Sequence, residues 1–135
     1  MIRPTITPHL TVTPAAEAIA FYTKVFKATE NMRRMADDGK RVLHCELQFA
    51  DGIVMVADAF PEHGSPKLPP LAGLSPVTIN IDMPTAADVN SVAARALGMG
   101  AIAEMGPVDT FWGTRFAKFR DPFGHRWMMN APLET

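Results

Sequence analysis

The sequence predicts an α+β fold made of two βαβββ modules, whose strands form a curved, cup-like mixed sheet with the helices on its outside. Three observations support this prediction. Several segments alternate polar and apolar residues, as half-buried strands do, and two stretches carry apolar residues at helical spacing. The order of these segments then recurs within the 135 residues, a length that fits one domain.

The first module is expected at about residues 4–60. Pro14 favours a helix start because its fixed φ and missing N–H suit a first helical turn. Gly39 and Gly52 mark turns between the later strands. The expected elements are strands at 5–12, 29–36, 40–49 and 53–58 and a helix at 15–26.

The second module is expected at about residues 76–131, after a linker at 61–75 that holds four of the twelve prolines. Thr-Pro-Ala-Ala-Glu at 13–17 corresponds to Pro-Thr-Ala-Ala-Asp at 84–88, which indicates an internal repeat. The expected elements are strands at 77–82, 101–105, 114–120 and 125–130, a helix at 85–98 and a loop from Pro107 to Gly113.

Alternation along each strand assigns side chains to one of two faces. The apolar face should pack on the helix, as expected for Leu43, Cys45 and Leu47 on strand 40–49. The other face should line a cleft between the two half-sheets. The residues expected there are Thr7, His9, Thr11, Val42, His44, Glu46, Gln48, Thr78, Asn80, Asp82, Arg126 and Met128.

The polar members of this set are candidate site residues, because a buried His or Glu without a partner would cost several kcal/mol. Glu46 and His44 are the candidate catalytic pair, as general base and proton donor. His9, Gln48 and Asn80 are candidate ligand contacts. The alternative is that these side chains only hydrogen-bond their neighbours and line a wet pocket.

Two further candidates lie near the loop before strand 114–120. Arg115 could pair with a carboxylate or phosphonate beside the aromatic wall of Trp112. A salt bridge at the rim is the alternative for Arg115, and a lid over the protein's own core is the alternative for Trp112. His125 follows a turn glycine, which favours a structural role. Cys45 should be a buried, unreactive thiol.

Several segments together resemble one family. They are Pro8-His9-Leu10-Thr11-Val12, Ala18-Ile19-Ala20-Phe21-Tyr22, His44-Cys45-Glu46-Leu47, Phe111-Trp112-Gly113-Thr114-Arg115 and Asp121-Pro122-Phe123-Gly124-His125-Arg126-Trp127. The chain is similar over about residues 4–130 to the vicinal oxygen chelate superfamily of glyoxalases, bleomycin resistance proteins and extradiol dioxygenases, and to its PhnB-like branch. The resemblance implies a cup that binds a small molecule, often completed in a homodimer, and in most enzymes a divalent metal.

The ligand positions of the glyoxalase type correspond here to Thr7, Glu46, Thr78 and Met128. Only Glu46 is a ligand for a hard metal, since a hydroxyl is a poor ligand and a thioether is soft. The usual ligand quartet is therefore not present. A different set, His9, His44 and Glu46, would give two histidines and one carboxylate on a single face.

Two functions fit these expectations. The first is a glyoxalase-like enzyme, of lyase or isomerase type, acting on a small oxygen-rich or anionic metabolite. The second is a non-catalytic protein that sequesters a drug or antibiotic, as bleomycin resistance proteins do. The bound metal, the substrate and the reaction are left open.

Charge and composition exclude other partners. The net charge is −1, with 13 basic and 14 acidic residues mixed along the chain, so no basic stripe for nucleic acid is present. No stretch reaches the ~20 apolar residues that a membrane span needs. A single cysteine and no signal-peptide pattern at the start predict a cytoplasmic protein.

Overall fold

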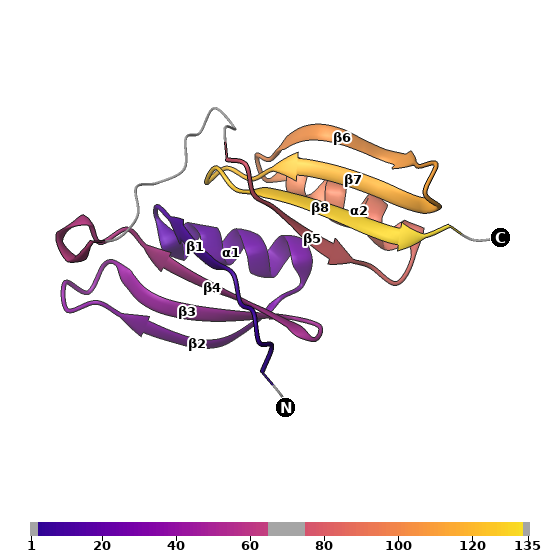
Figure 1. Ribbon diagram of the computed structural model, residues 1–135. Coiled ribbons are helices and arrows are strands. Elements are labelled where there is room, and N and C mark those ends of the chain that lie inside the picture. The colour runs from indigo at the N-terminus through magenta and orange to yellow at the C-terminus, as the bar shows by residue number, and fades with distance from the viewer. Residues whose placement is uncertain (1–2, 65–74, 134–135) are drawn as a thin grey trace. The chain divides into compact units, whose positions relative to one another are not determined.

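The structure is a computed structural model that describes residues 3–64 and 75–133, in two compact units that divide after residue 69 (Figure 1). The first unit contains β1 (His9–Val12), α1 (Ala15–Phe26), β2 (Thr29–Met35), β3 (Val42–Phe49), β4 (Gly52–Asp58) and the 3₁₀ turn η1 (Pro61–His63). The second contains β5 (Thr78–Asp82), α2 (Ala86–Gly98), β6 (Ile102–Asp109), β7 (Thr114–Arg120) and β8 (Arg126–Pro132). None of the described helices is long and apolar enough to span a membrane.

Both units have the βαβββ order that the sequence predicts, and their sheets have the same topology. The strand order is β1-β4-β3-β2 in the first sheet and β5-β8-β7-β6 in the second. In each sheet the first strand runs parallel to the last, and the other pairs are antiparallel. The parallel pair is joined through the helix, because a parallel connection needs a long crossover.

Each helix packs an apolar stripe against its own sheet. In α1 the stripe includes Ala18, Ile19, Tyr22 and Val25, and in α2 it includes Val89, Val92, Ala93 and Ala96. The sheets contribute alternating buried residues to the same contacts, such as Val54 and Val56 on β4 and Trp127, Met129 and Ala131 on β8. The apolar side of every central strand therefore faces its helix.

The two helix N-termini are capped by different means. Thr85 begins α2 with a capping box, in which its side chain accepts from the Asp88 N–H and the Asp88 carboxylate accepts from the Thr85 N–H. Pro14, before α1, has no side-chain cap. The buried carboxylate of Asp58 instead accepts from the Ala15 N–H at 2.9 Å and from the Val42 N–H at 2.6 Å.

The turn before β8 is tied to the core of the second unit. Asp121 Oδ1 accepts from the backbone N–H groups of Phe123 and His125, at 2.8 and 3.0 Å. Its Oδ2 accepts from the indole N–H of Trp127 at 2.8 Å, and Trp127 is fully buried. Asp121 thus joins the turn to the largest core side chain, and the backbone of His125 takes part in this turn.

Three expectations about the strands were wrong. The first strand begins at His9, not at residue 5, and Ile6 is 85% exposed. Strand β6 extends through residues expected in the loop, to Asp109. The pairing of β2 with β3 skips Leu43, so the alternation reverses there: Val42 is buried on the helix side, and Leu43 is 45% exposed. Such a bulge adds one residue to a strand and shifts the faces of its neighbours.

Candidate functional site

Apart from Arg115 and Trp112, the candidate site residues lie on the helix-free faces of the two sheets, meaning the faces opposite α1 and α2. Strand alternation and the buried residues define these faces. The first includes His9, Thr11, His44, Glu46, Gln48 and Met55, and the second includes Thr78, Asn80, Asp82, Thr114, Phe116, Lys118, Arg120, Arg126, Met128 and Asn130.

Glu46 is the centre of a polar cluster on the first helix-free face. It lies between Met32 of β2 and Met55 of β4, and Met55 pairs in turn with His9 of β1. Arg3 binds both carboxylate oxygens of Glu46, at 2.9 and 3.2 Å, and the Nε2 of His44 lies 3.2 Å from Oε2. The expected pair of Glu46 and His44 is therefore in contact, with an arginine as third member.

These contacts decide how Glu46 can act. The hydrogen bonds from Arg3 and then from His44 hold the pKa of the Glu46 carboxyl below its ordinary value. A lowered pKa keeps the carboxylate ionised but makes it a weaker proton acceptor. Burial, followed by the nearby His44, lowers the pKa of His9, so its imidazole is neutral at pH 7. The neutral imidazole of His9 is thus a second group on this face that can accept a proton.

Replacing Arg3 with alanine should raise the pKa of Glu46 toward its ordinary value of 4.5, because the largest cause of its lowering is removed. The carboxyl carbon of Glu46 can be followed by NMR during a pH titration and assigned with the Glu46→Gln variant. Lys24→Gln, an exposed change on α1, is the control and should leave the titration unchanged. An unaltered Glu46 pKa in Arg3→Ala would show that the ion pair does not form in solution.

The donor atoms of this face do not fit a metal ion. Among residues 3–64 and 75–133, no group of three or more His, Cys, Asp and Glu side chains is arranged to hold one. One strand, β4, lies between His9 and Glu46, so they are two strand spacings, about 10 Å, apart across the sheet. Both Glu46 oxygens already accept from Arg3. Thr78 and Met128, positions implied by the family resemblance, offer only a hydroxyl and a soft thioether.

The second helix-free face carries a continuous chain of hydrogen bonds centred on Asn130 of β8. Asn130 Oδ1 accepts from the indole N–H of Trp112 at 3.2 Å and from the hydroxyl of Thr114 at 2.7 Å. Its Nδ2 donates to Asn80 at 2.8 Å, and Asn80 donates to Asp82 at 2.9 Å. Two of the candidate ligand contacts, Trp112 and Asn80, are thereby brought together.

An aromatic cluster adjoins this chain. Trp112 packs edge-on against Phe116, with ring centroids 5.6 Å apart, and against Phe111 at 5.0 Å. Phe116 is buried, whereas Trp112 is 49% exposed. Thr110 closes the turn that carries Trp112 by hydrogen bonds to the backbone of Thr114. Trp112 therefore covers Phe116 and still exposes aromatic surface to a ligand.

Two other candidates lie apart from these clusters. Arg115 is on the helix side of β7, where its guanidinium binds Asn90 of α2 at 3.0 Å and Asp109 of β6 at 3.1 Å. Gln48 is on the first helix-free face, but its amide is held by Asn31 and by the carbonyl of Ala50. Arg115 joins helix to sheet, and Gln48 lies at the edge of the Glu46 cluster.

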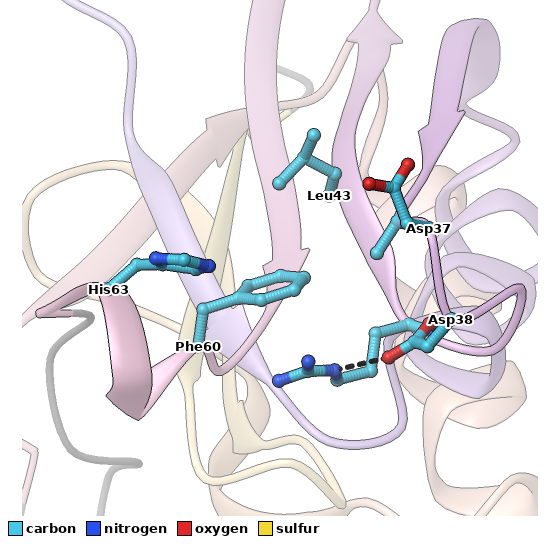
Figure 2. A pocket seen from close by; sticks show the side chains of 7 residues that line it. Asp37, Asp38, Leu43, Phe60 and His63 are labelled. Atoms are coloured by element: carbon cyan, nitrogen blue, oxygen red, sulfur yellow. Dashed lines mark hydrogen bonds and ion pairs between the residues drawn. The ribbon is translucent and has the colours of Figure 1, made fainter.

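A cavity of about 260 Å³ lies in the first unit where the turn between β2 and β3 meets η1 (Figure 2). The Arg41 guanidinium lies 4.2 Å from the centre of the Phe60 ring and binds Asp38 and Glu62. The hydrogen bond from Arg41 is the main reason that the pKa of Glu62 is lowered to about 2. Two carboxylates already balance the Arg41 charge, so the cavity is poorly suited to an anion. Its lining consists of Ala36, Asp37, Asp38, Arg41, Leu43, Phe60 and His63.

Cys45 is fully buried on the helix side of β3, as predicted. Burial is the main reason that the pKa of its thiol is raised to about 11. The native protein should therefore resist a thiol-specific disulfide reagent at pH 8, whereas the unfolded protein should react with one equivalent. Absorbance of the released thiolate measures both. Rapid stoichiometric labelling without denaturant would contradict the buried position.

Three residues of these clusters were not singled out from the sequence. Asn130 shares the alternation of Arg126 and Met128, so extending that pattern by one step would have found it. Phe116 lies on a strand with apolar residues on both faces, which hides its direction. Arg3 precedes the first strand and carries no periodic signal, so only the three-dimensional structure shows its contact with Glu46.

Comparison with known proteins identifies one family and relatives over nearly the whole chain. The model of the Glyoxalase/Bleomycin resistance protein/Dioxygenase superfamily matches residues 5–129. An uncharacterized protein of Mycobacterium bovis is 38% identical over 134 residues, covering 98% of this chain and 86% of the relative. A relative in Mycobacterium tuberculosis has the same identity and coverage of this chain, and 76% of that protein is covered.

Solved structures share the fold at low sequence identity. Protein PA1353 of Pseudomonas aeruginosa has a TM-score of 0.75 at 22% identity, covering 99% of this chain and 100% of the other. A PhnB protein of Bacillus cereus has a TM-score of 0.73 at 18% identity, covering 95% and 99%. The fosfomycin resistance protein FosX of Listeria monocytogenes, solved with Mn(II) and a dihydroxypropylphosphonic acid, has 0.71 at 16%, covering 98% and 93%.

Proposed function

This chain belongs to the Glyoxalase/Bleomycin resistance protein/Dioxygenase superfamily, and we propose that it binds a small oxygen-rich or anionic metabolite on its helix-free sheet faces. The observation that carries the proposal is the hydrogen-bonded chain from Trp112 through Asn130 to Asn80 and Asp82. It presents amide, hydroxyl and carboxylate groups next to an aromatic surface, a combination suited to hydroxyl-bearing molecules. The phosphonate in FosX is an oxygen-rich anion of comparable kind.

A catalytic form of this function would use the first helix-free face. His9, neutral at pH 7, could accept a proton, and His44 could donate one. Glu46 could serve as the base only after Arg3 leaves it, since the ion pair weakens its affinity for a proton. We therefore assign binding to both faces and limit proton transfer to the histidine-containing one.

The second candidate function is sequestration of a drug or antibiotic without chemistry. The Arg3–Glu46 ion pair favours sequestration, because the carboxylate of the cluster is already paired with an arginine. A sequestering protein would bind its ligand and return it unchanged. Product analysis by NMR after prolonged incubation with a bound ligand separates the two functions.

The binding proposal is tested by thermal-shift and NMR titration with glycerate, glycerol phosphate and hydroxyethylphosphonate. Asn130→Ala should abolish the shifts on the second face, because Asn130 joins Trp112 to Asn80. Arg115→Gln is the matched control, since it removes a polar contact on the opposite side of the same sheet. Unchanged binding in Asn130→Ala, or no binding of any probe to either face, would overturn the proposal.

Three broader features belong to the same proposal. We place the protein in the cytoplasm, where a lone buried thiol such as Cys45 stays reduced. We also place the chain in the PhnB-like branch, supported by the motif from Asp121 to Trp127 and by the PhnB protein of Bacillus cereus. We propose a homodimer because the family resemblance implies a cup that is often completed in one. Light scattering at several protein concentrations tests the dimer, and a monomer throughout would refute it.

A further inference from the structure

Along its strands, the second helix-free face changes from aromatic and hydrogen-bonding side chains to cationic ones. On β7 it presents Thr114 and Phe116, then Lys118 and Arg120. Phe116 pairs with Asn130, Lys118 with Met128, and Arg120 with Arg126. One end of the face is therefore aromatic and hydrogen-bonding, its middle carries a methionine, and its other end is cationic.

The charges at the cationic end are not balanced by its own residues. Arg126 binds Glu104 at 3.0 Å and the carbonyl of Ser75 at 2.8 Å. The side chains of Lys118 and Arg120 form no hydrogen bond or ion pair in the described part of the chain. Apolar residues lie beside them on β6, where Met105 pairs with Lys118 and Ile102 with Arg120. Two uncompensated cations beside apolar side chains favour an anion that carries an apolar body.

The spacing fixes how such a molecule would lie. Residues two apart on a strand are about 7 Å apart and residues four apart about 13 Å. A ligand that reaches from Trp112, above Phe116, to the Lys118 or Arg120 side chain therefore holds its anionic group roughly 7–13 Å from its apolar end. Met128, half-buried between the two ends, supplies an adaptable apolar contact for the middle of the molecule.

From this gradient we infer that the ligand is an elongated amphipathic anion, with its carboxylate or phosphate at Lys118 and Arg120 and a flat apolar end against Trp112, which covers Phe116. This inference rests on the proposed function and specifies its ligand class and orientation on one sheet. The anion lies away from Asp82, whose carboxylate is at the aromatic end of the face.

The test compares phenylbutyrate with butyrate, which lacks the ring, and with phenylbutylamine, which has the opposite charge. Titrations followed by backbone amide NMR should show phenylbutyrate binding at least tenfold more tightly than either, with shifts on β7, β8 and the Trp112 turn. The double variant Lys118→Gln/Arg120→Gln should weaken phenylbutyrate binding about tenfold or more, because it removes both charge-assisted contacts. Trp112→Ala should weaken phenylbutyrate but not butyrate.

Arg34→Gln is the matched control, since the Arg34 side chain, on β2 of the other sheet, has no hydrogen bond or ion pair with any residue that the structure describes. It should leave phenylbutyrate affinity unchanged. The inference is overturned if the amine binds as well as the acid, if the double variant keeps full affinity, or if phenylbutyrate does not bind. The proposed function survives each of these outcomes when the oxygen-rich probes still bind in an Asn130-dependent manner, so the two failures are distinguishable.

Discussion

Replacing Trp127 with alanine is expected to lower the free energy of unfolding by about 3–5 kcal/mol, the range for a large aromatic side chain removed from a core. Trp127 is fully buried between β5 and β7 on the helix side of the second sheet. The change also removes the hydrogen bond to Asp121 and leaves a buried carboxylate oxygen with one partner fewer. Chemical denaturation followed by circular dichroism measures the loss.

The protein contains its own control for this experiment. Trp112→Ala removes the second of the two tryptophans, which is half exposed and packs on Phe116 from outside. Its cost in unfolding free energy should be about 1 kcal/mol or less. If the two alanine variants differ by less than about 1 kcal/mol, the described packing of Trp127 is wrong.

Replacing Asp58 with alanine should cost about 3 kcal/mol of unfolding free energy. Its two carboxylate oxygens accept from the N–H groups of Ala15 and Val42 in a buried position. Both donors would lose their acceptor, and each buried unsatisfied donor costs about 1–3 kcal/mol. The same denaturation measurement applies.

Two further variants test the cause of the Asp58 effect. Asp58→Asn keeps one acceptor oxygen and should recover part of the stability. Asp51→Ala removes an exposed aspartate from the turn between β3 and β4 and should be nearly neutral. A loss below about 1 kcal/mol in Asp58→Ala would show that solvent or neighbouring groups satisfy these two donors.

The elements of the fold were predictable because each follows from a local pattern. Helical spacing in α1 and α2 and alternation in β3 gave their positions closely, and Cys45 and Leu47 are buried as expected. The errors arose where a pattern is interrupted. Nothing local distinguishes Leu43 from its neighbours, since the bulge is created by pairing with β2. The direction of Val42 therefore depends on a strand elsewhere in the chain.

The sequence predicted which side chains belong to the candidate site better than it predicted which partners they contact. Alternation placed His44, Glu46 and Asn80 on polar faces, and the structure shows that each has a hydrogen-bond partner there. Arg115 was expected either to pair with an anionic ligand or to form a salt bridge, and the structure shows the salt bridge, with Asp109. Phe116 is an apolar residue on the helix-free face, and Trp112 packs over it. Alternation along one strand does not indicate such contacts with residues distant in the sequence.

The unequal capping of the two helices has a consequence for the order of folding. The cap of α2 is three residues away along the chain, so this helix carries its own start signal and can form early. The acceptor for the α1 cap is 43 residues away, on the last strand of its module. The first turn of α1 therefore gains full protection only once β4 has docked, and loop-closure entropy opposes that step. One repeat nucleates locally, while its counterpart depends on a late, non-local contact.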